Sequence, residues 1–151
     1  MGQKVNPIGL RVGISKTWNS KWYAGKDYPE QLKQDLSIQK FVKKRLKHAA
    51  ISHIEVERTA KKTKVNIFTA RPGIIIGRKG DEVERLKHEL NKLTRHEVIV
   101  NIKEIKRPEI EATLVAENIA NQLERRIAYR RAIRRAMTSA MRMNIAGCKI
   151  M

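Results

Sequence analysis

Apolar and polar residues first form a regular pattern after Ser37, a plausible helix N-cap. The apolar positions that follow lie three or four residues apart, as on one face of a helix: Ile38, Phe41, Val42, Leu46 and Ala49. Apolar residues then alternate with polar ones over 51–58 and 63–69, which predicts two strands. The connection at 59–62 is short enough to make these strands a hairpin.

A glycine-rich loop between two helical segments comes next. Pro72 suits a first helical turn and predicts a short buried helix through Ile76, interrupted by Gly77-Arg78-Lys79-Gly80. A one-sided helical stripe follows, and alternation returns over 96–105. The predicted order over 37–109 is helix, strand, strand, short helix, loop, helix and strand. This order predicts an α+β domain in which a three-stranded sheet packs on helices.

Both flanking segments differ from this domain. Residues 1–36 begin with a glycine-containing stretch that has no helical period, so we expect an irregular N-terminal arm. Residues 110–143 are helical in pattern, but they carry two apolar stripes that differ in direction by roughly 110°. The first stripe is Ala112, Val115, Ala116, Ile119, Ala120, Leu123 and Ile127, and the second is Tyr129, Ile133, Ala136, Met137 and Ala140. The segment 110–151 should therefore have a kink or break near 127–128, or a second packing partner for its distal half.

Composition then limits the function. The chain has 151 residues, with 33 Lys or Arg against 15 Asp or Glu, and a net charge of +18. Its apolar runs are far shorter than the roughly 20 residues that span a bilayer, and no secretory signal is evident. A single cysteine, Cys148, indicates a reducing compartment. Because phosphate backbones are the most common partner of such a charge, nucleic acid is the expected ligand.

The positive charge is concentrated in three blocks that contain no acidic residue: 4–26, 58–79 and the chain after Glu124. The last block is the densest, and its arginines share one arc of the predicted helix. A run of one sign without carboxylate partners is typical of nucleic-acid contact. In the arm, Trp18 and Trp22 lie among basic residues and have two interpretations of equal weight. They stack on bases or riboses, or they pin the arm to the domain.

The Gly-X-X-Gly loop offers a specific means of holding RNA. Two residues without a Cβ let the backbone approach a phosphodiester closely, and Arg78 and Lys79 supply charge. The helix that follows adds free N–H groups and the positive end of its dipole. Alone this motif is weak evidence, but its place between the short helix and the long one favours a nucleic-acid function.

The residues do not support an enzyme. The chain has no phosphate-binding loop of the NTPase type, and its four histidines and lone cysteine have no zinc-site spacing. We therefore expect no catalytic residue, no metal, no cofactor and no small-molecule substrate.

Residues 38–106 resemble a KH domain of type II, with Gly77–Gly80 as its backbone-clamping loop. Beyond the domain, three further stretches resemble the family of third proteins of the small ribosomal subunit. They are Met1-Gly-Gln-Lys-Val-Asn-Pro, Thr69-Ala-Arg-Pro-Gly-Ile-Ile-Ile-Gly, and Gln122-Leu-Glu-Arg-Arg with Arg130-Arg131-Ala132.

This resemblance implies a structural component of the small-subunit head, in a cytoplasmic ribosome or inside an organelle if encoded there. Its implied partners are ribosomal RNA, messenger RNA at the channel by which it enters, and neighbouring head proteins, with no membrane. The family's channel-lining cluster falls on Arg130, Arg131 and Arg134, with Arg135 beside it. The expected RNA-binding residues, from the residues and the resemblance together, are Lys4, Arg11, Lys16, Trp18, Trp22, Arg71, Gly77, Arg78, Lys79, Gly80, Arg126, Arg130, Arg131, Arg134, Arg135 and Arg142.

Family members continue beyond a segment like Gly147-Cys148-Lys149-Ile150, which resembles the first strand of a C-terminal domain. The sequence is then a truncated or split form, or another chain supplies the missing sheet. A second functional hypothesis also fits the residues, namely a free-standing KH-type regulator or assembly chaperone that binds naked RNA.

Overall fold

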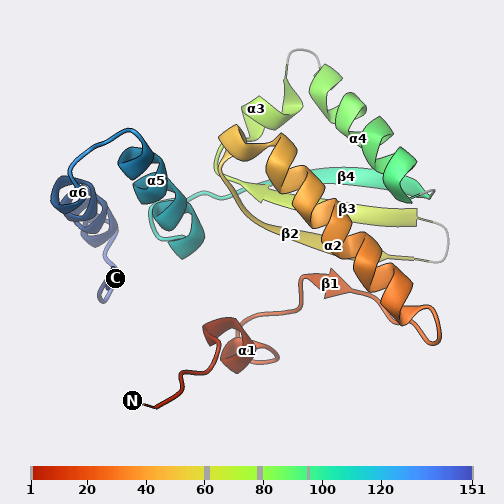
Figure 1. Cartoon of the computed structure of the whole chain (residues 1–151), viewed down its shortest axis with the longest axis horizontal. Coiled ribbons are helices and arrows are strands. Elements are labelled where there is room, and N and C mark those ends of the chain that lie inside the picture. The colour runs from red at the N-terminus through yellow and green to blue at the C-terminus, as the bar shows by residue number, and fades with distance from the viewer. Residues whose placement is uncertain (1, 60–61, 78–79, 95, 151) are drawn as a thin grey trace.

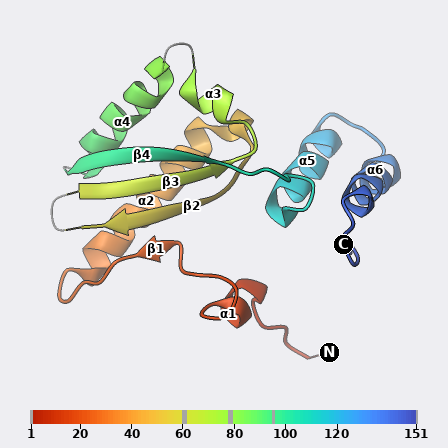
Figure 2. The ribbon, with the colours of Figure 1, turned by 180° about the vertical axis from the view of Figure 1, so that it is seen from behind.

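The computed structural model describes residues 2–59, 62–77, 80–94 and 96–150. A hairpin of β2 (Ile51–Arg58) and β3 (Lys62–Thr69) lies at the centre of its sheet, and β4 (Glu97–Glu104) pairs parallel to β3. The helices α2 (Tyr28–Arg45) and α4 (Asp81–Thr94) cover one face of this sheet, as Figures 1 and 2 show from opposite sides. The short helix α3 (Pro72–Ile76) precedes α4. This order confirms the predicted α+β architecture of a type II KH domain.

The core lies between the helices and the sheet. Because the apolar stripes of α2 and α4 face the alternating apolar residues of the strands, their side chains are removed from water together. The buried cluster consists of Ile38, Val42, Ala49, Ile51, Ile54, Val65, Ile67, Ile75, Leu86, Leu90 and Val98. It fixes the position of α3 and of the start of α4, and so of the loop between them.

Leu86→Ala is expected to lower the free energy of unfolding by about 2–5 kcal/mol, because it opens a cavity at a side chain that is only 2% exposed. Denaturant unfolding measures this loss. Leu93 on the same helix is 49% exposed, so Leu93→Ala is the matched control and should change stability by less than about 1 kcal/mol. Equal losses in the two variants would contradict the core assignment.

The first domain helix begins earlier than predicted. Ser37 was expected to cap it, but α2 starts at Tyr28, with Pro29 in its first turn. Ser37 lies inside the helix, where its Oγ donates to the Lys33 carbonyl oxygen at 2.8 Å. The buried face of the first turns carries Asp35 instead of an apolar residue, so the hydrophobic pattern did not reveal these turns.

The N-terminal arm is more regular than the irregular segment that we expected. Asn6 caps the short helix α1 (Pro7–Arg11), since its Oδ1 accepts the Ile8 N–H at 2.9 Å. Further along, β1 (Ser20–Lys21) pairs parallel to β2 and extends the expected three-stranded sheet to the order β1-β2-β3-β4. The arm is thus part of the domain's sheet.

A buried carboxylate holds this arm in place. The Asp35 side chain is fully buried, and its Oδ2 accepts from Ser20 Oγ at 2.8 Å and from Trp22 Nε1 at 2.6 Å. Its Oδ1 accepts from Arg58 Nε at 2.9 Å, and the Arg58 guanidinium lies 6.0 Å from the Trp22 ring centroid. Of the two interpretations of Trp22, the structure supports the one in which it pins the arm.

The C-terminal segment forms two helices, separated near the position that the two apolar stripes predicted. Four residues separate the end of helix α5 (Ala112–Glu124) from the start of α6 (Tyr129–Arg142), and Arg126 among them has a positive φ of 59°. The expected stripe on α5 is only partly buried: Ile119 is buried, but Leu123 is 44% exposed, and the unpredicted Leu114 is buried.

The expected strand at 147–150 is not formed. A strand is held by hydrogen bonds to a neighbouring strand, and no described segment lies in that position beside these residues. Within the described ranges, no helix is both long and apolar enough to cross a bilayer.

Candidate nucleic-acid interface

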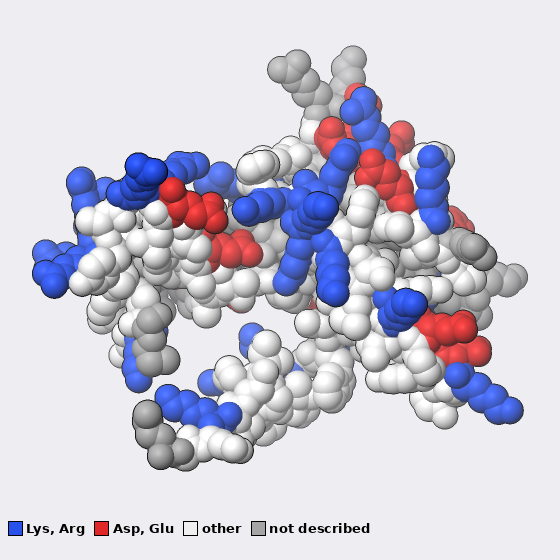
Figure 3. All heavy atoms as spheres, in the orientation of Figure 1, with Lys and Arg blue, Asp and Glu red and all other residues white. Residues whose placement is uncertain are grey.

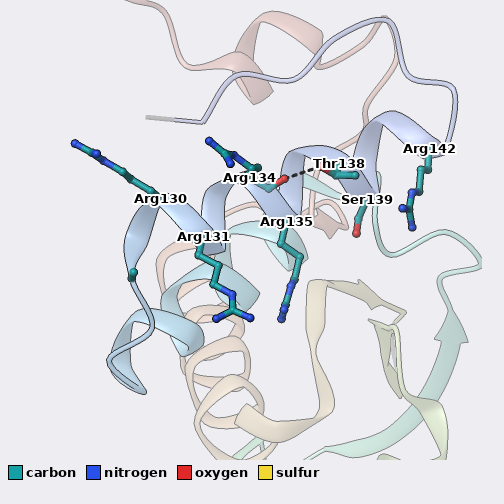
Figure 4. Close-up of a pocket in the computed structure, with 8 residues that line it drawn as sticks. Arg130, Arg131, Arg134, Arg135, Thr138, Ser139 and Arg142 are labelled. Atoms are coloured by element: carbon teal, nitrogen blue, oxygen red, sulfur yellow. Dashed lines mark hydrogen bonds between the residues drawn. The ribbon is translucent and has the colours of Figure 1, made fainter.

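Five arginines gather on the solvent side of α6, and they are defined here as the α6 arginines: Arg130, Arg131, Arg134, Arg135 and Arg142. Together with Ala128, Thr138 and Ser139 they line an open hollow of about 550 Å³ (Figure 4). The opposite side of α6 carries small buried residues, Ala132 and Ala140, which let the helix lie close to its packing partner. The helical period therefore directs the arginines outward.

The α6 arginines point to two sides of the helix. In Figure 4 the side chains of Arg131 and Arg135 extend to the same side, whereas Arg130 and Arg134 extend away from it. The Thr138 hydroxyl is not directed at these guanidiniums, since its Oγ1 donates to the Arg134 carbonyl oxygen at 2.9 Å. The arrangement presents planar donors along the helix and around part of its circumference.

The α6 arginines have no carboxylate partner in the part of the chain that the structure describes. Arg130 lies against its neighbour Tyr129, with Nε 3.1 Å from the phenolic oxygen and the guanidinium 5.7 Å from the ring centroid. No acidic residue follows Glu124 in the sequence. The guanidinium donors thus remain free to bind bidentately to phosphate oxygens of an external ligand.

The glycines of the Gly-X-X-Gly loop have the backbone conformation that the motif requires. Gly77 and Gly80 have positive φ values of 68° and 87°. A Cβ at Gly77 would lie only 2.9 Å from Glu82 Cγ. Only glycine satisfies both conditions at Gly77 without strain. Arg78 and Lys79, which the sequence assigns to RNA binding, lie outside the described residues.

The remaining predicted residues lie on other surfaces. Lys4, Arg11, Lys16 and Trp18 are exposed on the arm, and Trp22 is half-buried against α2. The arm runs along the β1 side of the sheet, whereas α3 and α4 meet at the β4 side (Figures 1 and 2). Arg71 and Arg126 are exposed in the connections before α3 and before α6. The structure therefore brings the α6 arginines together and keeps the arm and the loop separate from each other.

The sheet face that α2 and α4 leave open carries an aromatic stack. His53 stacks on Phe68 with ring centroids 4.1 Å apart, and burial lowers the pKa of its imidazole, although Glu55 and Glu111 partly oppose the shift. Lys103 Nζ lies 5.0 Å from the Phe68 ring centroid. Among the described residues, no three side chains of metal-binding type lie together.

Comparison with known proteins shows which proteins this chain is similar to. Residues 37–110 match the KH domain family. The small ribosomal subunit protein uS3 of Geobacter sp. (strain M21) is 60% identical over 150 residues, which cover 99% of this chain and 71% of that protein. The uS3 proteins of Geotalea uraniireducens and Syntrophus aciditrophicus are 60% and 57% identical over the same share of this chain, and over 71% and 69% of their own lengths.

Proposed function

This chain belongs to the family of small ribosomal subunit proteins uS3, and from that premise we propose that its α6 arginines contact messenger RNA where it enters the subunit. The chain is a structural, RNA-binding ribosomal protein and is not an enzyme. The finer proposal is that the Gly-X-X-Gly loop and the basic arm bind ribosomal RNA while α6 faces the messenger. Neighbouring proteins of the subunit head are its proposed protein partners.

One observation carries this proposal: five exposed arginines lie on one helix without an acidic partner among the described residues. In free protein these charges repel one another, and a phosphate backbone relieves that repulsion while releasing its condensed counterions. Arginine forks bind phosphate without reading base sequence, which suits a surface along which messenger of any sequence must move. Such contact needs no nucleotide hydrolysis.

Sedimentation tests the ribosomal role. The protein is expected to migrate with small subunits in a gradient at moderate salt, because many phosphate contacts and neighbouring proteins hold it there. A free-standing regulator or assembly chaperone would remain at the top of the gradient and bind naked single-stranded RNA tightly and reversibly. That second distribution would contradict a stable place in the subunit.

Replacing both Arg78 and Lys79 with Asp is expected to weaken binding to ribosomal RNA by at least tenfold, because it turns two positive charges of the clamp into negative ones. The thermal unfolding midpoint should change little, since the core is made of other residues. Filter binding and calorimetry measure the two quantities. A loss of stability as large as that of Leu86→Ala would count against the loop assignment.

A further inference from the structure

A second basic surface runs along α2, in a part of the sequence that charge blocks did not single out. Its members are defined here as the α2 lysine row: Lys33, Lys40, Lys43, Lys44 and Lys47, the last of these directly after the helix in the turn Lys47–Ala49. All five side chains are exposed, and the opposite face of α2 buries Asp35, Ile38 and Val42. Figure 3 shows basic side chains gathered over the C-terminal half of α2, in the centre of the face drawn.

The α2 lysine row has no ion-pair partner among the described residues. Arg45, on the same helix, shows the contrast: its guanidinium lies 3.8 Å from Glu82 and 3.6 Å from Glu89. Glu117 and Glu124 of α5 line a small hollow with Lys43 and Lys47, yet no ion pair joins them. The arginine of α2 therefore lies near the acidic residues of α4, whereas the charges of the lysine row have no ion-pair partner among the described residues.

The spacing of the row suits an extended polyanion. Lys33, Lys40 and Lys44 are separated by seven and four residues, so they lie on one face of the helix. At 1.5 Å per residue they extend over about 16 Å. Side chains three or four residues apart are about 5–6 Å apart at Cβ, and long lysine stems can adjust to successive phosphates.

We propose that the α2 lysine row is an additional binding surface for the phosphate backbone of ribosomal RNA, separate from the Gly-X-X-Gly loop and from α6. The inference rests on the RNA-binding function proposed above. Protein interfaces are depleted of lysine and centred on aromatic or apolar anchors. Among the described residues of α2, the large apolar side chain exposed within the row is Leu36, which is 49% exposed. Lysines on one helix face without such anchors favour phosphate contact, which positions the domain and carries no sequence preference.

The test compares two variants that each lose three charges. Lys40, Lys43 and Lys44 are all replaced with Gln in one, and the exposed lysines Lys87, Lys92 and Lys106 in the other. Glutamine and lysine have similar helix propensities, so both variants should unfold at the wild-type temperature. Binding to small-subunit ribosomal RNA is measured between 50 and 200 mM salt. The slope of log affinity against log salt should fall by about 2–3 units in the α2 variant and by less than one unit in the control.

Equal slopes in the two variants would overturn the proposal while leaving the RNA-binding function intact, since the wild-type protein would still bind. Absence of binding by the wild-type protein would instead remove the proposed function itself, and the inference with it. A third result is an α2 variant that binds naked RNA like the control but is lost from assembled subunits. That result would assign the row to a protein partner and would also overturn the RNA proposal.

Discussion

Replacing Arg130, Arg131 and Arg134 with Ala is expected to reduce the salt dependence of RNA binding by about 2–3 units of log affinity per log salt, with a loss of affinity of at least tenfold at 0.1 M salt. The reason is that each exposed guanidinium of α6 that neutralises a phosphate releases counterions, and these three have no carboxylate to bind instead. Titration of labelled single-stranded RNA at several salt concentrations measures both quantities.

A charge-preserving variant separates charge from geometry at these positions. Replacing the same three arginines with Lys keeps the net charge but removes the bidentate fork, so the salt slope should remain near the wild-type value while affinity falls modestly. Folding should be unaffected in both variants, because the buried face of α6 is formed by other residues, such as Ala132 and Ala140. A wild-type slope in the alanine variant would remove α6 from the RNA interface.

The second large effect concerns the buried anchor of the arm. Asp35→Ala is expected to lower the free energy of unfolding by about 3–5 kcal/mol, because it leaves the Arg58 guanidinium buried without its counter-charge. The same change removes the acceptor of Ser20 Oγ and Trp22 Nε1, so β1 should detach from β2. Denaturant unfolding measures the loss. Trp22 emission in a Trp18→Phe background reports the release of the arm as a shift to longer wavelength.

A double variant is the control for this prediction. Asp35→Ala combined with Arg58→Met removes both charges and fills part of the space with an apolar side chain, so it should recover much of the stability lost by Asp35→Ala. Its arm should still be released, because Trp22 and Ser20 lack their acceptor in both variants. A loss below about 1 kcal/mol for Asp35→Ala would contradict the anchoring role of this carboxylate.

The periodicity of apolar residues was enough to predict the domain from Ile38 to the last strand. Those elements bury apolar side chains on one face, and such burial requires apolar residues at regular spacing in the sequence. The break between α5 and α6 was predictable for the same reason, because a change of phase means a change of packing partner. The order of elements, together with the glycine spacing, was what identified the loop at Gly77–Gly80.

The arm and the start of α2 could not be predicted in this way. Their attachment depends on Asp35, a buried charge whose partners Ser20, Trp22 and Arg58 lie 15, 13 and 23 residues away. Polar contacts between residues distant in sequence produce no periodic pattern, so they cannot be predicted from the spacing of apolar and polar residues. The burial on α5 was predicted only in part, since the described chain covers only some of its apolar surface, and Leu123 remains 44% exposed.

Charge blocks likewise located only part of the basic surface. The acid-free stretch after Glu124 pointed directly to α6, because no negative residue there can pair with the arginines. Four of the five lysines, Lys40, Lys43, Lys44 and Lys47, also lie in a stretch without acidic residues, 36–54, but apolar residues stand between them, and their alignment on one exposed face emerges only when the helix is in place against the sheet. The fold therefore determines which of these lysines share one surface.

Ultraviolet crosslinking of small subunits that contain this chain, followed by mass spectrometry of the RNA-bound peptides, shows which of its basic surfaces contact RNA. If RNA phosphates compensate the basic side chains of this fold, RNA adducts will fall on peptides from α6 and on peptides from the Gly77–Gly80 loop. Adducts on other parts of the chain, with none on α6 or the loop, would contradict the account.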